Sequence, residues 1–205
     1  MALIGESVNI IKIAVTGNLA SGKSTVCRIF KEHGAYIVDA DAIVHHLISR
    51  DPECIQKIIK LLGTKVVIEG EIRRSLVAEM VFKNSEQLTK LEEILHPHVT
   101  LAIKKAYDNA KKSKAYSLFI AEIPLLFEIG LETFFDYTIA VISSEEESKQ
   151  RFINKGYTKE EFNMRIKRQF AAEEITKKAD FVINNEGSVE TLKKIVEKIM
   201  NQIRS

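Results

Sequence analysis

The chain has 205 residues, of which 45% are hydrophobic and 28% charged, a composition typical of a folded globular protein and not of a disordered one. Its 30 lysines and arginines against 28 aspartates and glutamates give a net charge of +2, too balanced for a polybasic nucleic-acid-binding protein. Two cysteines, Cys27 and Cys54, cannot build a disulfide framework, and no apolar stretch reaches the ~20 residues of a membrane helix. We therefore expect a cytoplasmic protein with reduced thiols that binds neither nucleic acid nor membrane.

Short apolar segments rich in β-branched residues alternate with longer amphipathic segments, a pattern that predicts buried strands alternating with helices. In chain order, the expected elements are strand 11–15, helix 25–33, strand 35–38, helices 41–50 and 53–62, a short strand or turn at 65–71, helices 74–82 and 86–95, helix 98–112, strands 117–123 and 137–142, helices 144–155 and 158–172, strand 181–183 and helix 189–203.

Pro97 interrupts the apolar spacing of one helical segment. Proline has no N–H to donate, and its ring clashes with the carbonyl four residues earlier in a helix. We therefore expect either a break at His96-Pro97 or a proline in the first turn of a new helix over 98–112.

Unbroken apolar strands alternating with helices predict an α/β fold, with a mostly parallel sheet of about five strands covered by helices on both faces. Two regions between strands are much longer than a simple crossover connection needs, one after the second strand and one after the fourth. We expect these two helical insertions to hold substrate-specific structure.

Residues 17–24 read GNLASGKS and match the phosphate-loop pattern G-x-x-x-x-G-K-[ST] between a predicted strand and a predicted helix. Backbone N–H groups and the positive end of the helix are expected to cradle a β-phosphate, while Lys23 reaches the β- and γ-oxygens and the Ser24 hydroxyl takes one Mg²⁺ position. The residues expected to contact the nucleotide are Gly17, Asn18, Leu19, Ala20, Ser21, Gly22, Lys23, Ser24 and Thr25.

The phosphate loop alone leaves the fate of the nucleotide open. Asn154-Lys155 lacks the aspartate of a GTPase base-reading motif, and the third strand carries only Glu122 where a motor ATPase would have a clear aspartate. A small-molecule kinase fits best. The alternatives are a kinase for another acceptor, such as a nucleoside monophosphate or a shikimate-like alcohol, and a nucleotide-dependent switch without an acceptor.

Two carboxylates, Asp39 and Asp41, follow the second predicted strand, where the ends of parallel strands face a ligand crevice. Carboxylates at this place can serve Mg²⁺ or accept a proton from an attacking hydroxyl. Either residue can equally cap the helix that follows, and the two roles are compatible.

Several motifs in a fixed order resemble the dephospho-CoA kinase family: the phosphate loop, V-D-A-D at 38–41, the pair Arg73-Arg74, L-H-P at 95–97 and P-L-L-F-E at 124–128. The likeness continues through Arg151, the spacing from Arg165 to Gln169, and Asn185, and it spans nearly all of residues 11–203.

The resemblance implies one kinase unit over residues 1–205, with a nucleotide core at 11–40, 115–142 and 178–205, an acceptor-binding insertion at 41–114 and a lid at 143–177. The implied reaction transfers the γ-phosphoryl group of ATP to the ribose 3′-hydroxyl of dephospho-CoA, the last step of coenzyme A synthesis. ATP, Mg²⁺ and dephospho-CoA are then the expected ligands, and a monomer or weak homo-oligomer the expected state.

The resemblance also assigns residue roles. Asp41 is the implied base, Thr16 lies near the reacting phosphates, and Arg151 stabilises the transferring group. Either Arg73 or Arg74 is expected to contact a phosphate, unless both are solvated surface, and Asn185 lies near the ATP base. The implied acceptor pocket is bordered by Asp39, His96, Pro124, Leu125, Leu126 and Glu128.

This chain departs from the family pattern at three places. Asn18 and Ala20 replace glycines of the loop; Ala20 costs little if its φ is negative, and asparagine tolerates a positive φ best after glycine. Glu122 stands where an aspartate is frequent, and Lys155-Gly156 replaces an Arg-Asp pair.

The histidines at 45, 46, 96 and 98 have no cysteine or acidic residue at a tight ligand spacing, so we expect them to line a pocket or to pack.

Overall fold

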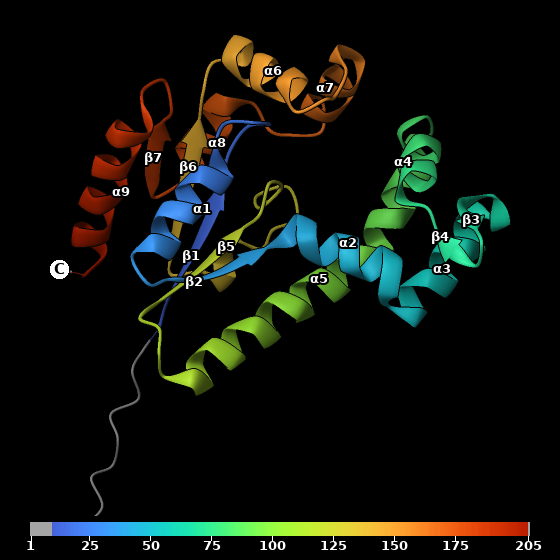
Figure 1. Cartoon of the computed structure of the whole chain (residues 1–205), viewed down its shortest axis with the longest axis horizontal. Helices are drawn as coiled ribbons and strands as arrows, with labels where there is room; N and C mark the ends of the chain where they lie inside the picture. The colour runs from blue at the N-terminus through green and yellow to red at the C-terminus, as the bar shows by residue number, and fades with distance from the viewer. Residues whose placement is uncertain (1–9, 205) are drawn as a thin grey trace, which may run out of the picture. The chain divides into compact units, whose positions relative to one another are not determined.

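The computed structural model of the chain describes residues 10–204 (Figure 1). The strands are β1 (Ile11–Thr16), β2 (Tyr36–Asp39), β3 (Val67–Ile68), β4 (Glu71–Ile72), β5 (Leu118–Glu122), β6 (Tyr137–Ile142) and β7 (Phe181–Asn184). The helices are α1 (Lys23–Glu32), α2 (Ala40–Arg50), α3 (Pro52–Leu62), α4 (Arg74–Phe82), α5 (Ser85–Ser113), α6 (Glu145–Asn154), α7 (Lys159–Ile166), α8 (Ala172–Lys178) and α9 (Val189–Arg204).

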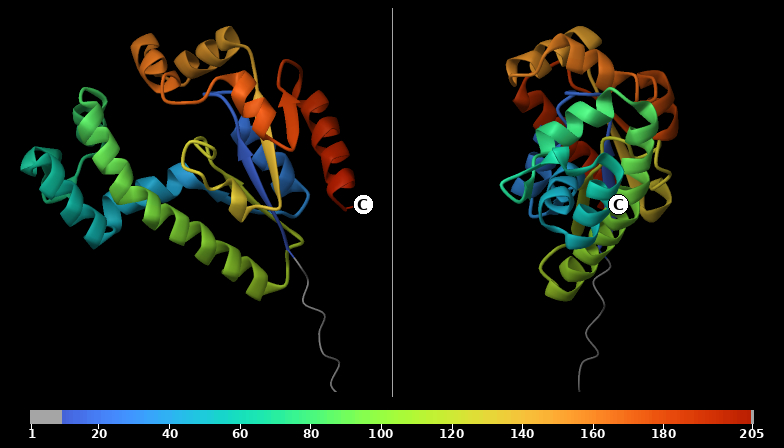
Figure 2. Two further views of the ribbon diagram at one scale, coloured as in Figure 1. Left: turned by 180° about the vertical axis from the view of Figure 1, so that it is seen from behind. Right: turned by 90° about the vertical axis from the view of Figure 1, so that its right-hand side faces the viewer.

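A five-stranded sheet with the order β2-β5-β1-β6-β7 forms the centre of the fold. The pairs β1–β5, β1–β6 and β6–β7 are all parallel, with Ile13 opposite Ile120 and Val141 opposite Ile183. Helices α1 and α9 cover one face and α8 lies on the other (Figure 2). The predicted α/β fold with about five strands is therefore confirmed. Among residues 10–204, no helix is long and apolar enough to cross a membrane.

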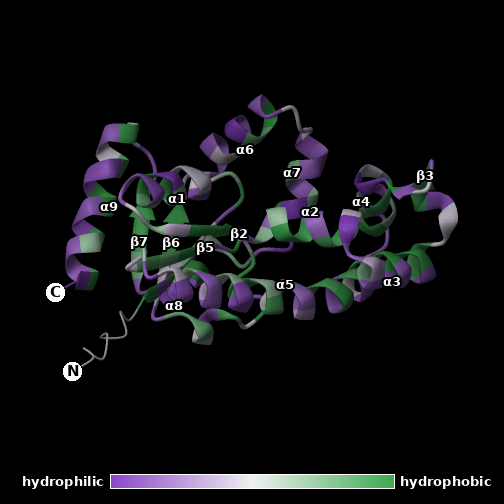
Figure 3. Ribbon diagram, turned by 60° about the horizontal axis from the view of Figure 1, so that its bottom comes forward, coloured by the Kyte–Doolittle hydropathy of each residue, from purple (hydrophilic) through white to green (hydrophobic). Residues whose placement is uncertain are grey.

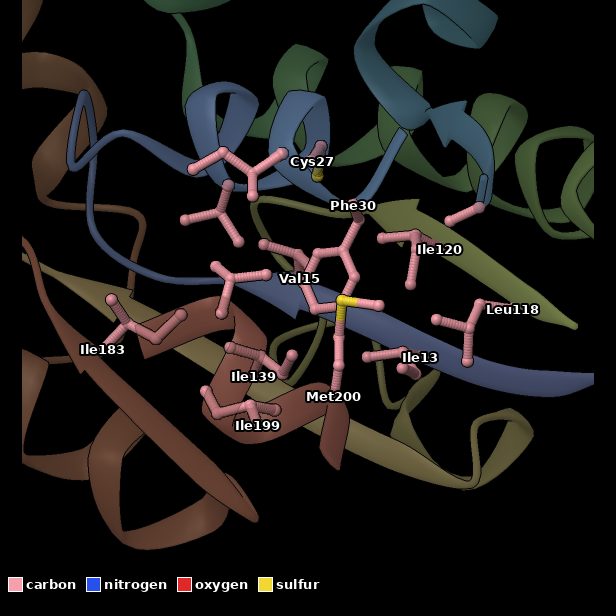
Figure 4. Packing of buried hydrophobic residues seen from close by; sticks show 14 of the residues in the cluster. Ile13, Val15, Cys27, Phe30, Leu118, Ile120, Ile139, Ile183, Ile199 and Met200 are labelled. Carbon is pink, nitrogen blue, oxygen red and sulfur yellow. The ribbon is translucent and has the colours of Figure 1, made fainter. Parts of the chain in front are cut away.

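The main core lies between this sheet and the two helices α1 and α9 (Figure 4). Alternate residues of β1, Ile13 and Val15, are fully buried beneath Phe30 of α1. Helix α9 buries residues spaced three to four apart, and its polar residues lie on the side away from the sheet (Figure 3). Each such fully buried aliphatic or aromatic side chain contributes roughly 1.5–3 kcal/mol to folding. The core therefore holds β1, which precedes the phosphate loop, in a fixed place.

The chain divides into two compact units, one of residues 10–38 and 106–204 and the other of Asp39–Lys105. The second unit has its own buried residues, including Ile58 of α3 and Val77 of α4. It also contains the predicted short strand at 65–71, which forms the antiparallel hairpin β3–β4. The predicted insertion ran to 114, whereas this unit ends inside α5. The predicted unit over 1–205 includes residues 1–9 and 205, which lie outside the described residues.

Helix α5 corrects the expectation at Pro97, because it runs without a break from Ser85 to Ser113 with the proline inside. Proline removes one backbone hydrogen bond there. The helix continues because one side of it is apolar on both sides of Pro97. The residues buried at four-residue spacing are Leu91, Leu95, Val99 and Ile103.

The predicted helix over 158–172 is also corrected. Helix α7 begins with a capping box between Thr158 and Glu161, as the sequence indicates, but it ends at Ile166, and α8 begins at Ala172. Between them the chain leaves the helical path, which places the Gln169 side chain against the phosphate loop. The apolar spacing of 158–172 favours one continuous helix, whereas the contact of Gln169 with the phosphate loop requires the helix to end before it.

Candidate active site

The phosphate loop connects the end of β1 to the start of α1, as predicted, and two of its glycines are required by close neighbours. Gly17 has φ +133°, and a Cβ atom there would lie 1.9 Å from the Val141 carbonyl oxygen. Gly22 has φ +102°, and a Cβ atom there would lie 2.2 Å from Asn185 Nδ2. A side chain at either position would force the loop away from β6 or from Asn185.

Lys23 is buried and folds back over the loop. Its Nζ donates hydrogen bonds to the carbonyl oxygens of Gly17 at 3.0 Å and Asn18 at 2.8 Å. Helix α1 begins at this residue with Gly22 as its N-cap, and no side chain within the described residues caps it. The N–H groups of a first helical turn and an adjacent ammonium form a site for a phosphate group.

Asn18 holds the loop to the segment that follows β6. Its Nδ2 donates to the Ser143 carbonyl oxygen at 2.8 Å, and its Oδ1 accepts from the Ser143 N–H at 3.2 Å. Nδ2 also lies 3.4 Å from Ser148 Oγ, which is 2.7 Å from Ser143 Oγ. Asn18 is not among the residues with positive φ. An asparagine at this position therefore acts through its side chain, which glycine could not do.

Ala20 is the non-glycine residue of the loop with a left-handed backbone, with φ +55°. Alanine in place of glycine would cost little stability here if φ were negative, and this condition is not met. In the left-handed region the Cβ atom approaches the following carbonyl oxygen, which costs about 1–2 kcal/mol for an L-residue. Ala20 consequently destabilises the loop relative to glycine.

Replacing Ala20 by glycine is expected to raise the free energy of unfolding by roughly 0.5–1 kcal/mol, because the strain relieved exceeds the entropy that glycine adds to the unfolded chain. Urea denaturation of the two proteins measures the difference. Ala102→Gly inside α5 is the control and should lose roughly 1 kcal/mol. A loss of stability in Ala20→Gly as large as in the control would contradict a left-handed backbone at this position.

Ser24 and Glu122 bring a hydroxyl and a carboxylate together at the edge of the loop. Ser24 Oγ donates to Glu122 Oε1 at 3.0 Å, and Glu122 ends β5 beside β1. Thr16, the last residue of β1, is buried, and its hydroxyl lies 3.4 Å from the Pro124 carbonyl oxygen. Glu122 is one methylene longer than the aspartate that is frequent at this position, and its carboxylate still reaches Ser24 of the phosphate loop.

The segment between α7 and α8 closes onto the loop and onto the P-L-L-F-E segment. Gln169 Nε2 lies 3.4 Å from the Gly17 carbonyl oxygen and 3.3 Å from that of Pro124. The next residue, Phe170, donates its N–H to Glu128 Oε1 at 2.8 Å. Within the same segment Pro124 and Leu125 are half-buried, whereas Leu126 is fully buried. Leu126 therefore packs in the interior, while Glu128 anchors the segment after α7.

Arg151 points from α6 toward the same loop. Its Nη2 donates to Glu147 Oε2 and to the Asn185 carbonyl oxygen, each at 3.1 Å. Asn185 in turn donates from Nδ2 to the Ser21 carbonyl oxygen at 2.7 Å. Arg151 Nη1 is buried and has no hydrogen-bond partner among the described residues. A buried guanidinium N–H without an acceptor favours binding of an anion at this position.

Two further arginines follow Arg151 in the predicted lid. The Arg165 guanidinium lies over the rings of Phe152 and Tyr157, with centroid distances of 5.3 and 4.9 Å, which fixes α7 to α6 by cation–π contacts. Burial lowers the pKa of the Arg168 guanidinium from its usual value, yet an arginine remains charged at neutral pH. A partly desolvated cation adds to the positive potential of this unit.

The remaining predicted residues belong to the second unit. Asp39 caps α2, because its Oδ1 accepts from the N–H groups of Asp41 at 2.8 Å and Ala42 at 3.2 Å. Asp41 is exposed in the first turn of α2. The capping role that the sequence left open thus falls to Asp39.

The other three predicted residues of this unit lie at the start of α4 and on α5. Arg73 is the N-cap residue of α4, with its Nη2 3.4 Å from Glu69 Oε2, and Arg74 is the exposed first residue of the helix. Burial lowers the pKa of His96 on α5, so this imidazole is neutral at physiological pH. A neutral imidazole can donate one hydrogen bond and accept another.

Sequence reasoning missed the contacts that hold the phosphate loop from outside. The sequence raises only the backbone conformation of Asn18 and the spacing of Gln169 from Arg165, and neither indicates the side-chain contacts of these residues. The contacts of Asn18 with Ser143 and of Gln169 with Gly17 join residues more than a hundred positions apart along the chain, so no local pattern signals them.

Comparison with known proteins gives the family. The model of the family described as dephospho-CoA kinase matches residues 11–191. The chain belongs to the dephospho-CoA kinase family. The dephospho-CoA kinase of Protochlamydia amoebophila is 44% identical over 195 residues, covering 94% of this chain and 96% of the relative. That of Aquifex aeolicus is 38% identical over 193 residues, covering 94% of this chain and 97% of the relative.

Two solved structures are similar to this dephospho-CoA kinase family member over almost its whole length. The dephospho-CoA kinase from Campylobacter jejuni superimposes with a TM-score of 0.61 at 28% identity, covering 94% of this chain and 96% of that one. The Thermus thermophilus protein TT1252 superimposes with a TM-score of 0.78 at 31% identity, covering 95% and 98%. The family predicted from the order of the motifs is confirmed.

Proposed function

We propose that this protein transfers the γ-phosphoryl group of ATP to the ribose 3′-hydroxyl of dephospho-CoA, which yields coenzyme A and ADP. The observation that carries the proposal is the match to the dephospho-CoA kinase family over residues 11–191, nearly the whole chain. The match includes both the phosphate loop and the second compact unit, so the resemblance is not limited to a nucleotide-binding motif shared by many proteins.

ATP is placed by the phosphate loop in this proposal. Lys23 Nζ leaves its two carbonyl partners for the β- and γ-phosphate oxygens, and the first-turn N–H groups of α1 bind the same phosphates. Arg151 Nη1, buried without an acceptor in the described chain, donates to a phosphoryl oxygen. Positive charge is thereby directed at the oxygens on which negative charge develops.

Mg²⁺ fits the oxygen atoms beside the loop. Ser24 Oγ and Glu122 Oε1 lie 3.0 Å apart, and a hydroxyl and a carboxylate are the hard donors that this ion prefers. Ser24, with Glu122 beside it, would hold the ion. When bound, Mg²⁺ neutralises charge on the phosphate oxygens.

The acceptor is oriented by the second unit. We assign Asp41 to the acceptor hydroxyl, whose proton its carboxylate accepts, and Asp39 to holding the first turn of α2 in place through its two cap hydrogen bonds. Gln169 and Phe170 tie the segment after α7 to the loop and to Glu128, which helps to exclude water from the phosphoryl group. Exclusion of water favours transfer to the alcohol over hydrolysis.

An acceptor panel tests the proposed function. The purified protein is incubated with ATP and Mg²⁺ and either dephospho-CoA, shikimate, adenosine monophosphate or no acceptor, and products are identified by mass spectrometry and ³¹P NMR. We expect a 3′-phosphorylated product from dephospho-CoA alone. Transfer to a monophosphate or to shikimate but not to dephospho-CoA would overturn the proposal. Slow ATP hydrolysis unaffected by any acceptor would favour a nucleotide-dependent switch.

We also propose that the protein works in the cytoplasm as a monomer or weak homo-oligomer and binds no nucleic acid. Its two cysteines form no disulfide, and its formal charge of +2 gives little long-range attraction to polyanions. Light scattering coupled to size-exclusion chromatography measures the oligomeric state.

A further inference from the structure

Three side chains that commonly bind metal ions meet where the start of α3 lies against α5. Asp51 is the N-cap residue of α3, Cys54 lies in the first turn of that helix, and His98 lies on α5. One ligand atom from each lies within 4.8 Å of the other two. All three residues belong to the second compact unit, and the phosphate-transfer chemistry proposed above uses none of them.

The spacing of these atoms is close to that of a tetrahedral metal site. With Zn–S near 2.3 Å and Zn–N and Zn–O near 2.0–2.2 Å, tetrahedral ligand atoms lie roughly 3.3–3.7 Å apart. The three ligand atoms lie within 4.8 Å of one another, so Asp51 and His98 must approach Cys54 more closely when they bind one ion. A fourth donor is also near, because Glu53 Oε1 lies 3.8 Å from His98 Nε2, although Lys57 Nζ holds the same oxygen at 2.6 Å. Glu53 or a water molecule can complete the coordination.

The chemistry of the three donors selects the metal. A thiolate, an imidazole and a carboxylate together suit Zn²⁺, whereas Mg²⁺ and Ca²⁺ prefer oxygen ligands alone. Cys54 is fully buried, while Asp51 and His98 are half-buried, so the site is shielded but reachable from solvent. Packing alone would favour apolar neighbours for a buried cysteine, and the neighbours of Cys54 include a carboxylate and an imidazole.

We propose that Asp51, Cys54 and His98 form a Zn²⁺ site that links the start of α3 to the middle of α5. Binding forms a Zn–S bond and displaces the thiol proton to solvent, with no change in oxidation state. Without metal the site is a helix cap: Asp51 Oδ1 accepts the Cys54 N–H at 2.9 Å. Burial and the neighbouring Asp51 raise the pKa of the Cys54 thiol to about 11, so the metal competes with a tightly held proton.

Zinc binding to the full chain, without nucleotide, tests this site. Wild type, Cys54→Ser, His98→Asn and Asp51→Asn are dialysed against a Zn²⁺ buffer series, and bound zinc is measured by elemental analysis. Asp51→Asn is informative because asparagine caps a helix as well as aspartate does while it removes the carboxylate. The matched controls are Cys27→Ala, which changes the other buried cysteine, and His46→Gln, which changes an exposed histidine of the same unit.

We expect one zinc ion per wild-type chain, and affinity at least about 10–100-fold weaker in each of the three ligand variants, since even residues that only support a metal ligand change affinity by this factor. Zinc should raise the melting temperature of wild type and both controls but not of the ligand variants. Co²⁺ should give thiolate charge-transfer absorption that Cys54→Ser abolishes.

The site is overturned if wild type binds zinc no more tightly than Cys54→Ser and Asp51→Asn, or if Cys27→Ala alone removes the cobalt absorption. Circular dichroism of the metal-free proteins identifies any variant that does not fold, and Asp51→Asn, which keeps the cap, then decides the question. None of these measurements uses ATP or an acceptor, so their outcome is independent of the proposed kinase function.

Discussion

Replacing Lys23 by alanine is expected to lower kcat/KM about 10²–10³-fold, the usual effect of removing one group that stabilises developing charge. The Lys23 ammonium is the buried cation of the phosphate loop and donates hydrogen bonds to two backbone carbonyl oxygens, those of Gly17 and Asn18. Phosphate oxygens are stronger acceptors than carbonyl oxygens, so the ammonium can leave these partners when ATP binds. Steady-state kinetics with ATP and dephospho-CoA, together with equilibrium binding of ATP, measure the effect.

The Lys23→Ala variant also removes one donor from each of two carbonyl oxygens, which keep contacts with Gln169 Nε2 and the Ser21 N–H. Each lost hydrogen bond costs roughly 0.5–1.5 kcal/mol of folding stability. Activity must therefore be compared at a temperature where denaturation curves show the variant fully folded. Lys31→Ala, in the last turn of the same helix, is the control and should keep wild-type kinetics. Normal kcat/KM in folded Lys23→Ala would contradict the role of this lysine.

Replacing Asp41 by asparagine is expected to lower kcat about 10²–10⁴-fold, the range that general-base catalysis contributes. The asparagine side chain has nearly the same shape but cannot accept a proton at neutral pH. ATP binds at the phosphate loop in our proposal, so its dissociation constant should change little. Single-turnover transfer to dephospho-CoA and ATP binding, measured on the same preparation, separate the two effects.

Glu79→Gln is the charge-matched control for Asp41→Asn. Glu79 is an exposed carboxylate on α4 in the same unit, and its i,i+4 pair with Lys83 is the kind of surface ion pair that contributes at most about 1 kcal/mol. This control should keep wild-type kcat. Turnover near the wild-type rate in Asp41→Asn would exclude this carboxylate as the base and would leave Asp39 as the carboxylate to test.

The phosphate loop was predictable because its chemistry is local. The run from Gly17 to Ser24 contains the turn, the start of the helix and the lysine that binds phosphate. Each of these features depends on residues within a few positions of it. The strands were predictable for a similar reason, since an unbroken apolar run such as 137–142 can be satisfied only when both of its faces are buried. The order of short motifs then identified the family, which the comparisons confirm.

Other features depend on residues far apart in the sequence. Apolar packing on both sides of Pro97 outweighs one missing hydrogen bond, and α5 remains continuous. The contacts of Gln169 with the loop end a helix that the spacing alone would extend. At Ala20 the backbone is left-handed although the residue favours the opposite, because the loop is fixed at both ends by β1 and α1.

Length, composition and local motifs by themselves determined the α/β fold and the phosphate loop, and they identified the family. Only the tertiary structure decided which side chains hold the loop and which acids cap helices, as with Asn18 and Asp39. It also brought Cys54 and His98 together, although the sequence gives these residues no shared motif. Local propensities act over a few residues, whereas these contacts form only when packing brings distant segments of the chain together. Each contact contributes only a small free energy, so the folded structure as a whole determines which of them form.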